Sequence, residues 1–429
     1  MLTAIDKDER TPSALSRLTS ARIARRVAGW CEAGLDATAL PFFPLLVIVP
    51  RGVAALISVA GLCAAGLVLS TGGPKSRPAL ATVGALLGCL LLWGMASAIW
   101  SVDWLRSLII TARLAGLFAS GLALVYAAGS IKAPGRLTFL LLGGLALAVT
   151  LTAADFVTHG AVGAPFTDRA YQPAGLNRAS VSFAILLLPM TAVLVSRGLP
   201  ICALLLATAT GAMIFILAGT TAKTALATGV AIALLLYLSR SRTAHAAAVI
   251  SVLVIITAPL TFARLGWSPE VTETADAVKL SAGHRVWIWS FAGDRIAERP
   301  LAGWGLDASR SIPGGKDPIR PGETWLPLHP HNAPLQLWLE LGVPGAVLFA
   351  LLVAYVWHAL AIAPWSRMFG AATGGSLAIA MIACIAAYGI WQEWWLGELW
   401  FSLFSVLVMS RVAPATIVRA EIPPLARLR

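Results

Sequence analysis

Long apolar runs recur along nearly the whole chain, and they constrain its fold more strongly than any other sequence feature. Many reach about 18 residues, which is enough for a helix to cross roughly 30 Å of hydrocarbon. Because hydrocarbon offers the backbone no water, only helices or closed barrels can span it, and continuous runs favour helices. Charged residues make up only 12% of the 429 residues, whereas soluble domains usually carry about 25%. The sequence therefore predicts an all-α polytopic membrane protein.

The apolar runs predict about twelve transmembrane helices and one large, partly helical loop between helices 9 and 10. We expect spans near 38–49, 52–70, 79–100, 108–129, 137–157, 180–196, 201–219, 224–239, 246–263, 342–362, 371–392 and 399–410. They divide the chain into a basic N-terminal segment at 1–37, helices 1–9 at 38–263, the loop at 264–341, helices 10–12 at 342–410 and a tail at 411–429.

Positive charge is distributed unevenly between the two sides of this arrangement. With the N-terminus inside, the inner segments hold 18 Lys and Arg residues, whereas the short outer connections hold five. Short loops rich in Lys and Arg stay in the cytoplasm, and long loops cross the membrane regardless of their charge. We therefore expect a bacterial inner-membrane protein with both termini in the cytoplasm and the 264–341 loop in the periplasm.

The sequence carries no motif that indicates a nucleotide or a metal. It lacks G-x-x-x-x-G-K-[ST], H-E-x-x-H and G-x-S-x-G, which are typical of phosphate loops, zinc proteases and serine hydrolases. His329 and His331 form an H-x-H pair, but a metal there would need further ligands that the sequence does not identify. We therefore predict neither a metal nor another cofactor.

Two segments of the expected loop combine chemically useful side chains with helix signals. The stretch from His284 to Pro300 contains Arg285 and reads as an amphipathic helix that stops at the proline. Further along, Asn332 is a good N-cap, so His331 lies just before a helix N-terminus, where anions are favoured. From these residues alone, His331 can equally be a capping residue and Arg285 an interfacial anchor.

Several motifs make the chain resemble the O-antigen ligase and O-antigen polymerase superfamily. Its signature is similar to the segment His331-Asn332-x-x-Leu335-x-Leu337-x-x-Glu340-Leu341-Gly342-x-x-Gly345. Further family landmarks resemble Arg285-x-x-x-Trp289, Gly303-x-Gly305, Trp100-Ser101-x-Asp103 and Gly175-Leu176-Asn177-Arg178. One departure is Thr220-Thr221-Ala222-Lys223-Thr224, where family members often carry a Thr-x-Ser-Arg sequence. Lysine keeps the positive charge but loses the planar fork of arginine.

The resemblance implies a GT-C-like glycosyltransferase that uses undecaprenyl pyrophosphate as the glycan carrier. Within this class, the first interpretation is an O-antigen ligase. Such an enzyme transfers polysaccharide to a hydroxyl of the lipid A–core oligosaccharide, inverts the anomeric configuration and needs no metal. In this reading His331 is the general base, and Arg285 is catalytic and binds the pyrophosphate together with Lys223 and Arg178. Asn332 supports His331.

Other functions fit the same sequence. The nearest alternative is an O-antigen polymerase, and a protein O-oligosaccharyltransferase or a lipid-linked sugar transporter follows. Two structural expectations concern residues outside the motifs. Arg113 lies within a span and is expected to form an ion pair, with Asp103 as a nearby candidate. Trp391, Trp394, Trp395 and Trp400 are expected to form a belt at the membrane interface.

Overall fold

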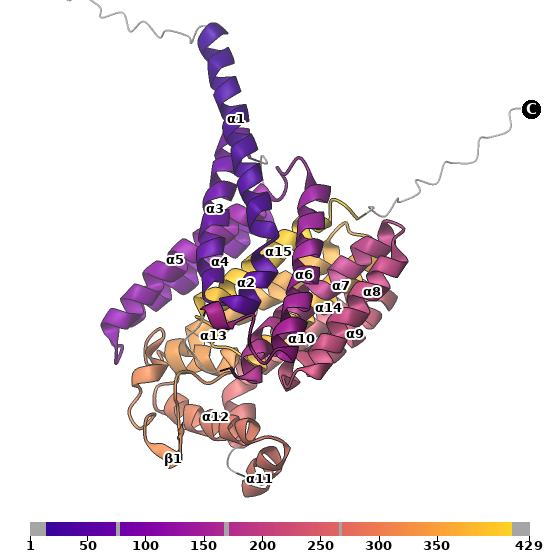
Figure 1. Cartoon of the computed structure of the whole chain (residues 1–429). Helices are drawn as coiled ribbons and strands as arrows, with labels where there is room; N and C mark the ends of the chain where they lie inside the picture. Colours follow the sequence, from indigo (N-terminus) through magenta and orange to yellow (C-terminus); the bar gives the residue numbers. More distant parts are fainter. Residues whose placement is uncertain (1–13, 74–77, 167–170, 266–267, 414–429) are drawn as a thin grey trace, which may run out of the picture.

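The computed structural model describes residues 14–73, 78–166, 171–265 and 268–413, and within these ranges the protein is a helical bundle with one short hairpin. Residues 1–13 of the expected N-terminal segment and 414–429 of the expected tail lie outside the described residues. Figure 1 shows the start of α1 at one end of the bundle and α11, α12 and β1 at the other. The predicted all-α polytopic architecture is confirmed.

Among the described residues, nine helices are long and apolar enough to cross a membrane. These nine are α3 (Gly52–Thr71), α4 (Pro78–Ser97), α5 (Trp104–Ala127), α6 (Pro134–Val157), α7 (Asn177–Ser196), α9 (Thr220–Leu238), α10 (Arg240–Leu265), α13 (Ala333–Ile362) and α14 (Arg367–Ala386). The bent pair α1 (Ala14–Ala39) and α2 (Phe42–Ile48), with a 42° angle, would make a tenth span. Two shorter apolar helices, α8 (Pro200–Ile216) and α15 (Glu393–Met409), complete the bundle. The exact number of twelve spans stays a prediction.

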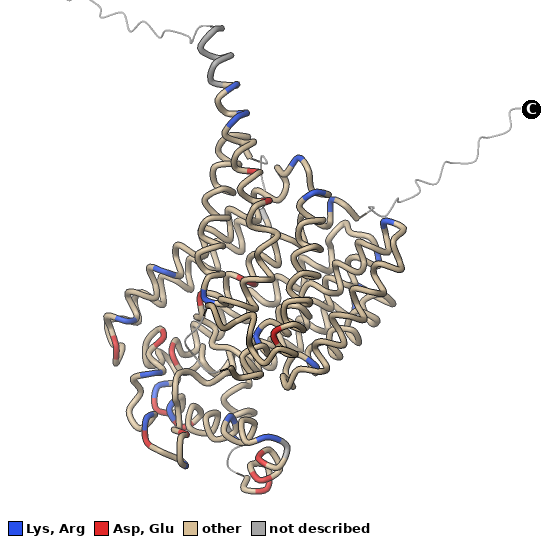
Figure 2. The backbone as a smooth tube through the Cα atoms, in the orientation of Figure 1, with Lys and Arg blue, Asp and Glu red and all other residues tan. Residues whose placement is uncertain are grey.

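The elements outside the long helices lie mainly between α10 and α13. They are α11 (Pro269–Val278), α12 (Leu280–Glu298), the 3₁₀ turn η3 (Ala308–Ser311) and an antiparallel pair, β1 (Pro318–Arg320) and β2 (Glu323–Thr324). The turns η1 (Ala164–Phe166) and η2 (Pro173–Leu176) precede α7. Helix α12 contains the amphipathic segment predicted to stop at Pro300. Most charged residues lie toward the two ends of the bundle, and most acidic ones are at the α11–α12 end (Figure 2).

At the end of the bundle opposite α11 and α12, charged side chains form hydrogen bonds with the backbone of the segments that connect the helices. The carboxylate of Glu32, on α1, accepts hydrogen bonds of 2.9 Å from the backbone N–H groups of Lys132 and Ala133, where α6 begins. Arg411 donates to the carbonyl of Ala128 at 2.8 Å, just after α5. Helix α1, the α5–α6 connection and the end of α15 therefore share one end of the molecule. The expected N-terminal segment is already helical from Ala14.

Helix α13 is broken at Gly342, whose φ of 61° and ψ of −155° are not helical. The loop after α12 fills this break. Trp304 N–H donates to the carbonyl of Leu339 at 2.9 Å, and Gly305 N–H donates to that of Glu340 at 2.9 Å. Near hydrocarbon, backbone groups released from a helix need such partners. The break thus fixes the first half of α13, Ala333 to Leu341, against the loop.

Gly303 is required for this close approach. Its φ is +70°, and a Cβ there would overlap the backbone of Glu340. We expect Gly303→Ala to lower the free energy of unfolding by about 2–4 kcal/mol, because it adds strain and separates the loop from α13. Thermal melting in detergent measures this loss. Gly116→Ala is the control, since a Cβ at Gly116 meets nothing within 4 Å. Equal melting of Gly303→Ala and wild type would contradict the expectation.

Candidate active site

Three motif segments that are far apart in the sequence meet at the C-terminal end of α14. Arg285, on α12, donates a hydrogen bond of 2.5 Å to the carbonyl of Ala386. Thr221, in the first turn of α9, donates to the same carbonyl at 3.4 Å. His331 Nδ1 lies 2.8 Å from the carbonyl oxygen of Ala387. The last carbonyls of a helix have no partner inside it, so the end of α14 offers acceptors that hold these side chains together.

The expected span 371–392 is therefore wrong at its outer boundary, because α14 already ends at Ala386. The chain beyond it is held by the first half of α13. Gln336 accepts a hydrogen bond of 2.9 Å from Ile390 N–H, and Trp391 Nε1 donates to Glu340 at 2.5 Å. These contacts draw the segment 387–392 alongside the histidine motif instead of continuing the helix.

His331 is placed by its backbone and by one hydrogen bond. Its φ is +54°, in the left-handed region, and Asn332 then caps α13 by accepting from Leu335 N–H at 3.0 Å. Because the Ala387 carbonyl can only accept, Nδ1 of a neutral His331 carries the proton. That tautomer leaves the lone pair on Nε2 available as a proton acceptor.

The surroundings keep His331 neutral. Burial lowers its pKa, the hydrogen bond to Ala387 opposes this shift, and the positive charge of Arg285 lowers the pKa further. Because the ordinary histidine pKa is about 6.5, a lowered pKa means that the ring is uncharged at neutral pH. A base must be unprotonated before it can take a proton, so this environment suits general-base chemistry.

His329 is the structural member of the histidine pair. Its Nδ1 accepts a hydrogen bond of 3.2 Å from His331 N–H, and the two rings lie 4.3 Å apart. Its Nε2 lies 3.0 Å from the side-chain amide of Gln392. Gly389 packs on the ring, where a Cβ would come within 2.7 Å of Cδ2. Both ring nitrogens are thus occupied, so His329 shapes the turn that presents His331.

Burial lowers the pKa of His329 to about 3, and the charges nearby add to the shift. Between pH 6.5 and 3 the unfolded chain therefore binds a proton that the folded one does not, and stability falls as the pH falls. The contribution is roughly 1.4 kcal/mol for each pH unit below 6.5. We expect the difference in melting temperature between wild type and His329→Gln to narrow from pH 7 to pH 5. A constant difference in melting temperature over this pH range would contradict the lowered pKa of His329.

Arg285 is a half-buried cation beside His331. Burial lowers its pKa, and the nearby phenol of Tyr388 opposes the shift. Among the described residues it has no carboxylate within ion-pair distance, so its charge is available to a ligand. Within the described ranges, its one hydrogen bond runs from Nη1 to Ala386, whereas a guanidinium has five N–H donors.

The other predicted cations lie at the starts of two neighbouring helices. Arg178, in the first turn of α7, interacts electrostatically with Tyr388, as Arg285 does. Asn177, beside it, packs against Gly219, the residue before α9. Lys223 lies half-buried in the first turn of α9, two residues after Thr221. The structure thus brings Arg178 and Lys223 to the same end of the bundle as His331 and Arg285.

Lys279 is a cation that the sequence did not single out. Its Nζ donates to the carbonyl of Ala218 at 3.3 Å, two residues before α9 begins. No motif contains this residue, so no sequence signal points to it.

A buried carboxylate that sequence reasoning left without a role joins the loop to the site. The fully buried Glu340 accepts hydrogen bonds from Asp307 N–H (2.7 Å), Trp391 Nε1 (2.5 Å), Gln336 Nε2 (3.0 Å) and Ser309 Oγ. The signal was present, because Gln336 and Glu340 are spaced i, i+4 on one helix face and Glu340 belongs to the family motif. Its partners in the loop and after α14 have no local signature.

Outside the motifs, the structure confirms the expected ion pair of Arg113 but with a different partner, and it corrects the expected tryptophan belt. Arg113 pairs with Glu393 at 3.1 Å, whereas Asp103 caps α5 and accepts from Ser311 at 3.0 Å. Three of the four expected interface tryptophans are core residues, with exposed fractions of 5% (Trp391), 0% (Trp395) and 9% (Trp400). Trp391 is buried because its N–H is satisfied by Glu340.

The described part of the chain holds no group of three or more His, Cys, Asp or Glu side chains that could hold a metal ion. The polar groups at the end of α14 are instead a neutral imidazole, a guanidinium and the amides and hydroxyls that orient them. This set can accept a proton and bind an anion.

The fold and this site define a polytopic membrane protein with a buried histidine and several cations at one end of its helical bundle. In a comparison with known proteins, residues 199–350 match the family described as O-antigen ligase. Over this region the chain is similar to the O-antigen ligase family, which confirms the resemblance seen in its motifs.

The similar curated proteins come from Rickettsia and carry the provisional name of polysaccharide ligase. The protein of Rickettsia conorii is 35% identical over 146 residues, which is 33% of this chain and 35% of that protein. The protein of Rickettsia felis is 34% identical over 146 residues, 33% of this chain and 36% of its own. The match thus spans about a third of the length of these relatives. No solved structure matches this chain.

Proposed function

We propose that this protein is an O-antigen ligase, which moves polysaccharide from undecaprenyl pyrophosphate to a hydroxyl of the lipid A–core oligosaccharide. The reaction takes place at the periplasmic face of the bacterial inner membrane. The observation that carries the proposal is the pair of His331 and Arg285, both held by carbonyls at the end of α14. Among the described residues, Nε2 of His331 has no hydrogen-bond partner and Arg285 has no carboxylate within ion-pair distance. The family match over residues 199–350 supports the class of reaction.

His331 is the general base of the proposed reaction. The acceptor is a sugar hydroxyl, which is a weak nucleophile until its proton is removed. His331 Nε2 takes that proton as the hydroxyl oxygen forms its bond to the anomeric carbon of the donor glycan. The Nδ1 hydrogen bond to Ala387 fixes the ring and stabilises the imidazolium that forms, as a fixed acceptor does for other catalytic histidines.

Arg285 stabilises the leaving group. As the new bond forms, the bond from the anomeric carbon to the pyrophosphate oxygen breaks, and undecaprenyl pyrophosphate leaves with the bonding electrons. Negative charge develops on that oxygen, and preformed cations stabilise it without reorganisation. Arg178 and Lys223 add positive charge, and the N-terminal ends of α7 and α9 favour an anion. Displacement from the opposite face inverts the anomeric configuration.

The distribution of positive charge supports placing the site outside the cytoplasm. The segments expected inside carry 18 Lys and Arg residues, against five in the short connections expected outside, and short loops rich in these residues stay in the cytoplasm. Among the described residues, Lys132, Arg136 and Arg411 lie at or beside the α5–α6 and α15 connections, at the end opposite the site.

Transfer by the purified protein in proteoliposomes tests the proposal. The substrates are a glycan on undecaprenyl pyrophosphate and lipid A–core oligosaccharide, and the products are separated by gel and identified by mass spectrometry. We expect glycan on lipid A–core with inverted linkage. Longer glycan on the carrier, with none on the core, would instead identify a polymerase. Inhibition by a chelator would contradict a metal-independent reaction.

A further inference from the structure

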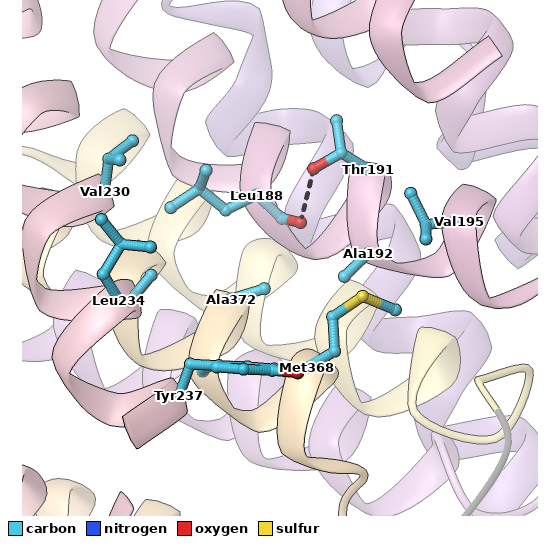
Figure 3. Close-up of a pocket in the computed structure, with 11 residues that line it drawn as sticks. Leu188, Thr191, Ala192, Val195, Val230, Leu234, Tyr237, Met368 and Ala372 are labelled. Atoms are coloured by element: carbon cyan, nitrogen blue, oxygen red, sulfur yellow. Dashed lines mark hydrogen bonds between the residues drawn. The ribbon is translucent and has the colours of Figure 1, made fainter. Parts of the chain in front are cut away.

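An apolar groove lies between α7, α9 and α14, with a cavity of about 250 Å³. Figure 3 shows its walls, which are formed mainly by Leu188, Val195, Val230, Leu234, Tyr237 and Met368. The hydroxyl of Thr191 also lines it but donates to the carbonyl of Leu188 at 2.8 Å, so it offers the groove no free donor. The groove is suited to a hydrocarbon chain.

The groove is remote from the histidine site. Helices α9 and α14 run antiparallel, with Thr221 beside Ala386 at the site end and Tyr237 beside Arg367 at the opposite end. The 16 residues from Thr221 to Tyr237 correspond to about 24 Å of helix. The groove therefore faces the half of the bilayer away from the site.

A basic pocket adjoins the groove at this end. Its cavity of about 280 Å³ is lined by Leu236, Arg240, Trp365 and Arg367. The Arg367 guanidinium lies 4.7 Å from the centre of the Tyr237 ring, which belongs to the groove. The Arg367 guanidinium and the Tyr237 ring therefore lie where the two cavities meet.

Both arginines keep donors and charge for a ligand. Arg240 Nη1 donates to the carbonyl of Trp365 at 3.0 Å, and Arg367 donates through Nε and Nη2 to carbonyls at the end of α9. A guanidinium has five N–H donors, so each retains some. Across the described ranges, neither arginine has a carboxylate within ion-pair distance. Two uncompensated positive charges therefore border an apolar groove.

We propose that the groove and the basic pocket together bind one anionic phospholipid from the leaflet on this side. One acyl chain lies along the groove between α7, α9 and α14, and the phosphate lies against Arg240 and Arg367. The positive charge of the pocket requires an anionic headgroup, because basic pockets between transmembrane helices attract anionic lipids. This site is separate from the proposed transfer reaction.

Native mass spectrometry of the full chain tests the proposal. The detergent-purified protein is titrated with phosphatidylglycerol or with phosphatidylcholine that has the same acyl chains. We expect one phosphatidylglycerol per chain, bound at least tenfold more tightly than phosphatidylcholine. The double variant Arg240→Gln/Arg367→Gln should lose this preference, whereas Arg242→Gln, a change of an exposed arginine two residues away on α10, should keep it.

A groove variant keeps the test decisive if the double variant does not fold. Val230→Trp changes an exposed groove residue (41% exposed) and should fill the space of the acyl chain, so that lipid binding falls while the melting temperature in lipid-free detergent is unchanged. Equal binding of the two lipids would overturn the proposal. It is also overturned if Val230→Trp retains the lipid, or if a polyprenyl phosphate displaces phosphatidylglycerol from the site.

Discussion

Replacing His331 with alanine is expected to lower the rate of glycan transfer by about 10²- to 10⁴-fold, the range typical of a lost general base. Without the imidazole, the acceptor hydroxyl must lose its proton to water while it attacks. Binding of the donor should change far less, because Arg285 keeps its own hydrogen bond to Ala386. Initial rates with purified protein in proteoliposomes measure the effect.

The matched control for His331→Ala is His245→Ala. His245 is an exposed histidine on α10 that hydrogen-bonds within its own helix, to the carbonyl of Ser241 at 2.8 Å. Its loss should leave the rate unchanged. If His331→Ala keeps its melting temperature and still transfers glycan at the wild-type rate, the imidazole is not the base.

The pH profile gives a second readout of the same group. Burial lowers the pKa of His331, and the base is active only when unprotonated. The activity should therefore persist below pH 6.5 and fall only as the pH passes the lowered value. An acid limb centred at or above pH 6.5 would indicate a solvated histidine or a different group.

Replacing Arg285 with alanine is expected to lower the transfer rate by about 10²- to 10³-fold, as the loss of one preorganised donor does at other charged transition states. The half-buried guanidinium has no competing carboxylate among the described residues, so its charge is directed at the substrate. Arg285→Lys should recover part of the rate, because lysine keeps the charge but not the planar fork.

Arg264→Ala controls for the loss of a cation, since Arg264 is an exposed arginine in the last turn of α10. Rates at saturating and limiting donor concentrations separate an effect on binding from one on the chemical step. An equal loss of transfer rate in Arg285→Ala and Arg285→Lys would show that the effect comes from the hydrogen bond to Ala386 and not from the positive charge. Wild-type activity in both would remove Arg285 from the mechanism.

The helical membrane architecture was predictable because it follows from local composition. Apolar runs specify helices wherever the solvent is hydrocarbon, and most expected spans coincide with observed helices. The predicted end of the amphipathic helix at Pro300 and the N-cap at Asn332 were also correct, since both depend on neighbours within a few residues. The family motifs identified His331 and Arg285 without showing where either lies.

The contacts that give these residues their chemistry depend on tertiary structure. His331 and Ala387 are 56 residues apart, and Arg285 and Ala386 are 101 apart. The expected continuous span 371–392 concealed the helix end that supplies both carbonyls. Likewise, Trp391 reads as an interface residue until the buried Glu340 is found to accept its N–H.

The sequence by itself determined that this protein crosses a membrane as helices and carries a histidine and an arginine typical of the O-antigen ligase family. Only the tertiary structure decided that His331 uses Nδ1 for its hydrogen bond, that Arg285 lies beside it with no carboxylate among the described residues within ion-pair distance, and that α14 ends where both side chains can bind carbonyls. Local patterns report periodicity and capping over a few residues. The tautomer and the electrostatic environment of a side chain depend instead on partners that only chain packing brings close.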